Sequence, residues 1–212
     1  MNVRTAACFA LLGLVPCLPG CGGGGSDGGL RNKNPGDNDV DVVAAFGDSL
    51  TQGSECACTP YPERLAGLIG KSVVNVGVAG TMAVENVERT QAAIDRFRPG
   101  FMLILYGAND VIHGYGPTAI SDALAQMLQI CKDSHVVPVL ATYPEPILDH
   151  AGFTAQILQL NVRIRSLASS QGVRCVDLEK EFGAEPELYQ ADGLHPSDAG
   201  TQIMAMAFAD LF

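Results

Sequence analysis

The chain has 212 residues, a formal net charge of -10, and 47% hydrophobic against 17% charged residues. This is the composition of a globular protein, and it excludes an intrinsically disordered chain. Because an acidic chain repels phosphate backbones, the charge also argues against a nucleic-acid partner. The length suffices for one domain with a sizeable core, and no internal repeat or second domain is visible.

The first twenty residues have the pattern of a secretory signal. Arg4 precedes a short apolar run over residues 6–18, which Pro16 interrupts. The run is too short to cross a bilayer, which requires about 20 apolar residues, but it fits the core of a signal peptide. We therefore predict a signal peptide over residues 1–20.

The sequence LPGC, residues 18–21, resembles the bacterial lipobox, in which a leucine and small residues precede a cysteine that becomes lipidated. Cys21 is the predicted lipidation site, and Cys17 is a poorer candidate because a proline directly precedes it. The alternative is a plain signal peptide with a cysteine near its cleavage site. Gly22 is not the aspartate associated with inner-membrane retention, so we expect a lipid-anchored protein of the bacterial envelope, in the outer membrane facing the periplasm.

Residues 21–39 are rich in glycine, asparagine and aspartate and offer little apolar surface to bury. Such a composition is typical of a flexible tether. The predicted organisation is therefore a signal peptide over 1–20, a lipidated cysteine with its tether over 21–39, and one folded domain over 40–212.

From residue 40 onward, apolar runs alternate with helical patterns. The runs predict strands over 40–46, 72–76, 101–107, 135–143 and 172–178. Strands that alternate with helices form βαβ units with right-handed crossovers. We therefore predict a five-stranded parallel sheet inside a three-layer α/β/α sandwich.

Between the runs, apolar side chains recur at helical spacing. They form three stripes: Ile120, Leu124, Met127 or Leu128, and Cys131; Ile157, Leu160, Ile164 and Leu167; and Ile203, Ala207 and Leu211. Ser197 is the predicted N-cap of the last helix.

Gly47, Asp48 and Ser49 follow the first apolar run at once. In open parallel sheets, sites form at the carboxyl ends of the strands. Ser49 should therefore lie at that edge, and the sequence GAND, residues 107–110, should reach the same edge from the third run.

A serine hydroxyl becomes a nucleophile only beside a base, and that base needs a group to orient it. Of the four histidines, only His195 shares a tight, glycine-bearing turn with a carboxylate, in DGLHP, residues 192–196. Asp192 could fold back onto the imidazole and fix its tautomer, so that His195 takes the proton of Ser49. Alone, the same turn fits a helix start capped by aspartate. His113 is either a pocket or a solvated loop residue, and His135 and His150 are predicted surface or loop residues.

Four segments occur in a fixed order: GDSLTQG (47–53), NVGVAG (75–80), GAND (107–110) and DGLHP (192–196). Together they resemble the four blocks of the SGNH, or GDSL, hydrolase family, nearest to its bacterial thioesterase/lysophospholipase/arylesterase type. The resemblance covers the chain from about residue 41 to its end. It implies an SGNH hydrolase domain over 40–212 with a flavodoxin-like sandwich, in agreement with the fold predicted above.

The resemblance also implies the roles of individual residues. Ser49 would be the nucleophile, His195 the base and Asp192 the orienting acid. The oxyanion hole would consist of the backbone N–H groups of Ser49 and Gly80 and the side-chain amide of Asn109. Neither a metal nor a cofactor is expected.

The two remaining motif carboxylates, Asp48 and Asp110, are expected to tie loops together through backbone hydrogen bonds. The motif does not fit the α/β-hydrolase lipases, whose G-x-S-x-G pattern is absent from residues 47–51.

The predicted function is that of a monomeric serine esterase acting on acyl esters or thioesters, lysophospholipids among them, through an acyl-enzyme. A carbohydrate O-deacetylase that acts on acetylated sugars is an alternative within the same chemistry. A lipid-anchored binding module without activity is a third reading, and the complete set of motif residues argues against it.

Four cysteines remain outside the signal and the lipidation site. Cys56 and Cys58 share one loop, and the sequence leaves open whether they pair with each other or with distant partners. Cys131 and Cys175 fall in helical and strand patterns and are predicted to be buried thiols. A metal site would require tighter Cys/His clustering.

Overall fold

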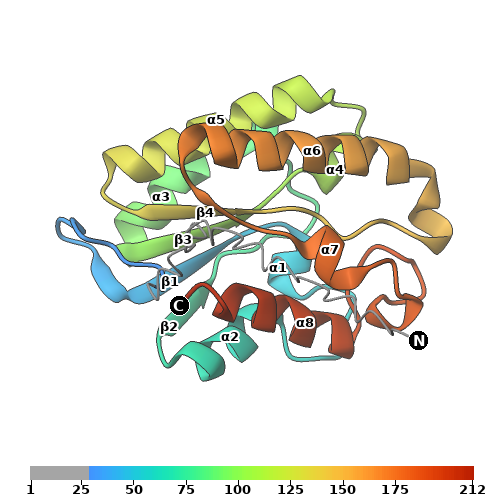
Figure 1. The fold of residues 1–212 in the computed structure, drawn as a ribbon, viewed down its shortest axis with the longest axis horizontal. Coiled ribbons are helices and arrows are strands. Elements are labelled where there is room, and N and C mark those ends of the chain that lie inside the picture. The colour runs from blue at the N-terminus through green and yellow to red at the C-terminus, as the bar shows by residue number, and fades with distance from the viewer. Residues whose placement is uncertain (1–28) are drawn as a thin grey trace, which may run out of the picture.

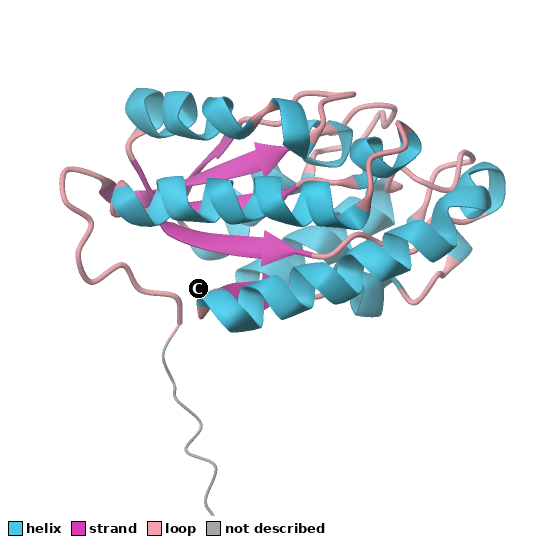
Figure 2. Ribbon diagram, turned by 90° about the horizontal axis from the view of Figure 1, so that it is seen from above, coloured by secondary structure: helices cyan, strands magenta, loops and turns pink. Residues whose placement is uncertain are grey.

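The computed structural model describes residues 29–212, so the predicted signal peptide and Cys21 lie outside the described residues. One central sheet separates two layers of helices (Figure 1). Helices α3 (Val87–Phe97), α5 (Pro117–Asp133) and α6 (Thr154–Gln171) cover one face, and α2 (Tyr61–Ile69) and α8 (Asp198–Ala209) pack together on the other. Figure 2 shows the same layers from above. Within residues 29–212, no helix is both long enough and apolar enough to span a membrane.

The sheet has five parallel strands in the order β2-β1-β3-β4-β5. They are β1 (Asp39–Gly47), β2 (Ser72–Asn75), β3 (Pro99–Leu105), β4 (Val137–Ala141) and β5 (Arg174–Val176). This confirms the predicted three-layer fold. The strand order is that of flavodoxin-like sheets, in which successive strands are added on one side of β1 and then, from β3 onward, on the other, and ligands of such folds bind at this switch point between β1 and β3.

Both faces of the central strands are covered, which explains their nearly continuous apolar runs. Every residue of β3 is buried, as are residues 43–47 of β1. Four strands end earlier than predicted: β2 by one residue, at 75, and three by two residues, namely β3 at 105 rather than 107, β4 at 141 rather than 143, and β5 at 176 rather than 178. Tyr106 and Tyr143 lie just beyond β3 and β4 and are still buried, so the apolar pattern continues after the strand geometry has ended.

Two of the three predicted helical stripes face the core. The predicted residues of α5 and the first three of α6 are buried. In α8, Ser197 is the N-cap as predicted, because its hydroxyl accepts the N–H of Gly200 (3.2 Å). The buried face of α8 is however formed by Thr201, Met204, Ala205 and Phe208, and the predicted stripe at 203, 207 and 211 is only half-buried. This helix is apolar on most sides, and Tyr61 of α2 stacks on Phe208, which fixes the face that turns inward.

The described part of the predicted tether, residues 29–38, is bound to the domain rather than flexible. The side-chain amide of Asn32 donates to the carbonyl oxygens of Gly100 (2.9 Å) and His135 (2.7 Å), and Leu30 packs against the core. The folded part of the chain therefore begins before residue 40. Asparagines, which count toward flexibility in a composition, here satisfy carbonyl groups at the amino-terminal edge of the sheet.

Candidate active site

The nucleophile candidate lies where the first strand ends. Residue 49 begins α1 (Ser49–Gln52), a single helical turn directly after β1. Asp48 is the N-cap of this turn, and its Oδ1 accepts the N–H of Leu50 (3.0 Å). The Ser49 side chain is held at the carboxyl edge of the sheet with 7% of the residue exposed.

The turn at 192–195 completes a hydrogen-bonded chain with Ser49. His195 Nε2 lies 3.0 Å from Ser49 Oγ, and His195 Nδ1 lies 2.5 Å from Asp192 Oδ2. The other carboxylate oxygen of Asp192 accepts the backbone N–H groups of Leu194 (2.9 Å) and His195 (3.0 Å). The structure thus brings together the three side chains that the sequence predicts as a triad.

The protonation of this chain follows from its hydrogen bonds. Burial opposes ionisation of Asp192, but the bonds from the His195 ring and from two backbone N–H groups outweigh it, and the pKa of Asp192 lies below its ordinary value. An ionised Asp192 accepts the Nδ1 proton of His195. Nε2 is then left as the acceptor that faces the Ser49 hydroxyl.

The loop after β2 is fastened beside α1. Val78 N–H donates to the carbonyl of Gly47 (3.0 Å), and Ala79 N–H donates to Gln52 Oε1 (2.7 Å). Gly80 follows with φ +74°, a backbone shape that favours glycine. Its N–H has no hydrogen-bond acceptor within residues 29–212, so it is free to donate to a ligand.

Asn109 lies in the short helix α4 (Ala108–Ile112), directly after β3. Its amide nitrogen donates to the carbonyl of Thr81 (3.1 Å) and points to Asp48 Oδ2 (3.4 Å). The amide therefore lies between the Gly80 loop and the residue that precedes Ser49. At the first position of α1, the Ser49 N–H has no partner in the helix. The three predicted oxyanion donors thus lie on three adjoining segments, which are α1, the Gly80 loop and α4.

Asp110 holds the segment that follows Gly80 in place through hydrogen bonds. Its buried carboxylate accepts the N–H groups of Ala83 (2.8 Å) and Val84 (3.0 Å), in the 3₁₀ helix η1 (Ala83–Glu85). Burial, opposed by these bonds, raises the pKa of Asp110. Its loop-tying role, predicted from the sequence, is confirmed.

Asp48 plays the same kind of role for the nucleophile turn. It is fully buried, and burial raises its pKa to about 6, against the opposing hydrogen bonds from Tyr143 and Leu50. The Tyr143 hydroxyl donates to Asp48 Oδ2 at 2.6 Å. The predicted structural role of Asp48 is confirmed, whereas its partner Tyr143 was not found by sequence reasoning, because it stands in no motif and continues an apolar run.

The other histidines are distributed over the molecule. His113 is exposed at the end of α4 and bonds to the carbonyl of Asn109 (2.7 Å), and His135 lies exposed at the opposite edge of the sheet. His150, predicted to be a surface or loop residue, is half-buried, and its Nδ1 donates to the backbone carbonyl of Asp192 (2.7 Å). It therefore supports the turn of the candidate base. No sequence pattern connects positions 150 and 192.

The segment after β4 makes further hydrogen bonds to the turn at 192–195 and to the residues just before it. Ile147 N–H donates to the carbonyl of Gly193 (2.9 Å), and the Tyr189 hydroxyl donates to the carbonyl of Glu145 (2.8 Å). Gly193 has φ +70°, and a β-carbon there would lie 2.1 Å from the carbonyl oxygen of Ile147. Only glycine fits this position without a shift of the backbone.

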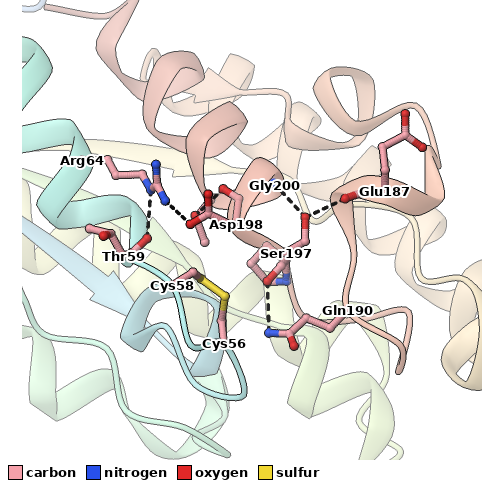
Figure 3. The surroundings of a disulfide bond; sticks show 11 residues. Cys56, Cys58, Thr59, Arg64, Glu187, Gln190, Ser197, Asp198 and Gly200 are labelled. Carbon is pink, nitrogen blue, oxygen red and sulfur yellow. Dashed lines mark hydrogen bonds and ion pairs between the residues drawn. A yellow bond between two sulfur atoms is a disulfide. The ribbon is translucent and has the colours of Figure 1, made fainter.

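Cys56 and Cys58 form a disulfide with each other, in the loop between α1 and α2, which resolves a pairing that the sequence left open. Figure 3 shows this loop facing the segment that contains Gln190 and Ser197, two residues that flank the turn at 192–195 in the sequence. Arg64 of α2 links this loop to α8, because it donates to the carbonyl of Thr59 (3.0 Å) and forms an ion pair with Asp198.

Cys131 and Cys175 are free thiols. Cys131 is buried as predicted, and Cys175 is half-buried. Burial raises their pKa values to about 12 and about 11, so both are protonated and unreactive near neutral pH. Within residues 29–212, no group of three or more His, Cys, Asp or Glu side chains is arranged to hold a metal ion.

Residues 45–203 match the GDSL-like Lipase/Acylhydrolase family. The chain belongs to this family. It is 26% identical to thioesterase 1/protease 1/lysophospholipase L1 of Escherichia coli K12 over 162 residues, which cover 74% of this chain and 76% of that protein. It is 27% identical to an arylesterase of Vibrio mimicus over 161 residues, 73% of this chain and 79% of that one. The family places the protein among hydrolases that act on ester bonds.

A solved structure agrees with the fold. A carbohydrate esterase family 3 protein from Talaromyces cellulolyticus superposes with a TM-score of 0.69 and 19% identity, covering 81% of this chain and 95% of that one. At this identity the likeness concerns the three-layer fold alone.

Proposed function

We propose that this GDSL hydrolase is a serine esterase that cleaves acyl esters or thioesters through an acyl-enzyme on Ser49. The observation that carries the proposal is the continuous chain of hydrogen bonds from Asp192 through His195 to Ser49, with contacts of 2.5 Å and 3.0 Å. A serine that already bonds to an imidazole nitrogen can pass its proton to that base as it attacks.

In the first half-reaction, Ser49 Oγ bonds to the carbonyl carbon while its proton moves to His195 Nε2. The carbonyl π electrons move onto the oxygen, and the Asp192 carboxylate stabilises the imidazolium. Collapse of the tetrahedral intermediate breaks the ester or thioester bond, and the leaving alcohol or thiol takes the proton from His195. Water then attacks the acyl-enzyme by the same route and releases the acid.

The developing oxyanion would be met by the N–H groups of Ser49 and Gly80 and by the amide of Asn109. Such donors act where charge appears in the transition state, and the loss of one typically costs about 10²–10³ in turnover. Their support is already present, because Asp110, Gln52 and Thr81 hold the three segments together.

We place acyl esters first among substrates. The relatives are a thioesterase/lysophospholipase and an arylesterase. Three large apolar side chains are exposed on the segments that follow β2, α4 and β4, namely Val78 (42%), Tyr115 (39%) and Leu148 (57%). These segments follow the carboxyl ends of β2, β3 and β4, the edge of the sheet that carries Ser49, and apolar side chains there suit an acyl chain. An acetylated sugar is the second candidate, because the fold likeness extends to a carbohydrate esterase.

The test is hydrolysis of a nitrophenyl acyl-ester series, beside an acetylated xylo-oligosaccharide, by the protein and its Ser49→Ala variant. We expect hydrolysis of the esters by the first protein and a loss of at least about 10³-fold in the second, with unchanged thermal unfolding. Equal rates for the two folded proteins would refute the serine mechanism. Release of acetate from the sugar alone would favour the deacetylase.

We also propose that the enzyme is anchored to the bacterial envelope through a lipid on Cys21. The support is the lipobox-like sequence at 18–21 and its position eight residues before the part of the chain that the structure describes. The anchor would hold the enzyme at a membrane surface.

A further inference from the structure

The buried carboxylate beneath Ser49 joins the ends of three strands. Asp48 follows β1, Asn109 follows β3, and Tyr143 follows β4. Asp48 Oδ1 accepts the N–H of Leu50, while Oδ2 accepts the Tyr143 hydroxyl at 2.6 Å and faces the Asn109 amide at 3.4 Å. One carboxylate oxygen of the residue before the nucleophile is thus contacted both by a tyrosine hydroxyl and by a predicted oxyanion donor.

Tyr143 is itself held firmly. It is fully buried, its N–H donates to Asn161 Oδ1 (2.9 Å), and its carbonyl accepts from Asn161 Nδ2 (2.8 Å). Asn161 is a buried residue of α6. The hydroxyl therefore approaches Asp48 from a fixed direction, and the short contact is typical of a charge-assisted bond to a carboxylate.

The orientation of the Asn109 amide depends on these neighbours. Thr81 offers a carbonyl oxygen and Asp48 an ionised carboxylate, and both are acceptors only. The amide must therefore turn its nitrogen, and not its oxygen, toward them. The bond to Thr81 (3.1 Å) is ordinary, whereas the contact with Asp48 (3.4 Å) is long, so this second hydrogen remains available to a stronger acceptor such as an oxyanion.

The Tyr143 hydroxyl affects this arrangement in two ways. It satisfies Asp48 Oδ2, which otherwise would draw the Asn109 hydrogen to itself. It also favours the ionised carboxylate against the burial that opposes it. Without the hydroxyl, Asp48 more readily keeps its own proton and becomes a donor, toward which Asn109 would turn its oxygen. Two further charged groups act on Asp48, His195 and Asp110.

We propose that Tyr143 is a positioning residue of the oxyanion hole: through its hydrogen bond to Asp48, it keeps the nitrogen of Asn109 available to the reacting carbonyl. The catalytic consequence rests on the esterase function proposed above, while the coupling of the three side chains does not.

A double-mutant cycle tests the catalytic part. We expect Tyr143→Phe to lower kcat about tenfold with KM changed less than twofold, a partial loss of one oxyanion donor. In the Asn109→Ala background, Tyr143→Phe should lower kcat less than twofold, because the residue it acts through is gone. The same tenfold loss in both backgrounds, or no loss in either, would overturn the proposal.

Tyr61→Phe is the matched control. Tyr61 is also fully buried, but its hydroxyl makes no hydrogen bond to Asp48 or Asn109 and faces the Thr51 hydroxyl instead. We expect this variant to keep the kcat of the wild type. A tenfold loss here as well would show that removal of any buried hydroxyl has this effect, and would overturn the specific role of Tyr143.

Nuclear magnetic resonance separates this proposal from the esterase function, because it requires no turnover. The side-chain amide signal of Asn109 should shift with the ionisation of Asp48 between pH 4 and 8, and Asp48→Asn should abolish that transition. Tyr143→Phe should move its midpoint to higher pH, since a bond to the ionised form is lost. If Tyr143→Phe does not fold, the titration of the wild type alone tests whether the Asn109 signal follows the ionisation of Asp48. An Asn109 signal indifferent to Asp48 would overturn the proposal even in an active esterase.

Discussion

Asp48 illustrates how a single side chain can serve a site at a cost to the fold. Its carboxylate is fully buried, and it receives hydrogen bonds from Tyr143 and from the N–H of Leu50. These bonds do not fully offset burial, since the pKa rises from an ordinary 3.8 to about 6. The ionised form that orients the nucleophile turn is therefore the form that the interior disfavours.

The first prediction concerns this carboxylate and pH. A folded-state pKa above the unfolded one means that the folded protein binds a proton more tightly. Stability should therefore fall as pH rises from about 4 to about 6, by an amount on the order of 2–3 kcal/mol. Urea unfolding between pH 4 and 7 should show wild type losing stability relative to Asp48→Asn.

The absolute stability of Asp48→Asn can differ from wild type at every pH, so the informative quantity is the change with pH. Asp37→Asn is the control, because that side chain is 93% exposed, and its difference from wild type should stay constant. A constant difference for Asp48→Asn as well would contradict the buried charge.

The chemistry-bearing side chains could be predicted from the sequence, whereas the residues that hold them could not. Ser49, Asn109 and His195 each stand in a motif that follows a strand or precedes the last helix, so topology alone brings them to one edge. Tyr143 and His150 act through tertiary contacts with Asp48 and with the turn at 192. Their neighbours in sequence have no bearing on those contacts, so no local pattern reveals them.

The turn at residues 192–195, which precedes α8, depends on one glycine. Gly193 has φ +70°, and a β-carbon there would collide with the carbonyl of Ile147, in the segment that leads to the 3₁₀ helix η2 (Leu148–Phe153). We predict that Gly193→Ala separates these segments, lowers stability by more than about 2 kcal/mol and lowers kcat/KM about tenfold or more, because Asp192 and His195 flank this position.

Gly172→Ala is the matched control for this substitution. Gly172 caps α6 with φ +64°, but no atom lies within 4 Å of a β-carbon built there. It should cost only the left-handed backbone, about 1 kcal/mol, and leave kcat/KM unchanged. Urea unfolding and ester hydrolysis on both variants would make the comparison, and equal losses would contradict a specific clash at Gly193.

The apolar runs correctly predicted where the strands lie, but not where they end. The third, fourth and fifth predicted strands each extend two residues beyond the observed ends, because Tyr106, Tyr143 and Leu178 remain buried after the chain has left the sheet. For α8, the four-residue spacing at 203, 207 and 211 indicated the wrong face. In a helix with apolar residues on several sides, the contact with α2 decides which face is buried.

The fold as a whole places its functional edge opposite the start of the described chain. Residues 29–38 run along the amino-terminal edge of the sheet, where Asn32 and Asn38 bond to carbonyl groups of Gly100, His135 and Ser134. The site lies at the carboxyl edge. A lipid on Cys21 would therefore attach the molecule from the end opposite its site, which is an arrangement that leaves the mouth accessible.

The anchor gives the next prediction. Expressed in a bacterium with an outer membrane, the protein should fractionate with membranes and incorporate a labelled fatty acid. Cys21→Ser should lose the label and become soluble while keeping its esterase activity, and Cys17→Ser should keep the label. Unchanged labelling in Cys21→Ser, or none in wild type, would contradict an anchor at this residue.

The most direct test of the triad is labelling with a fluorophosphonate, which forms a covalent bond with a serine only when that serine is activated. Peptide mapping of the labelled protein should find the adduct on Ser49, and His195→Ala should label at least about 10²-fold more slowly. A folded protein that carries no adduct on Ser49, or that labels equally fast without His195, would contradict the triad.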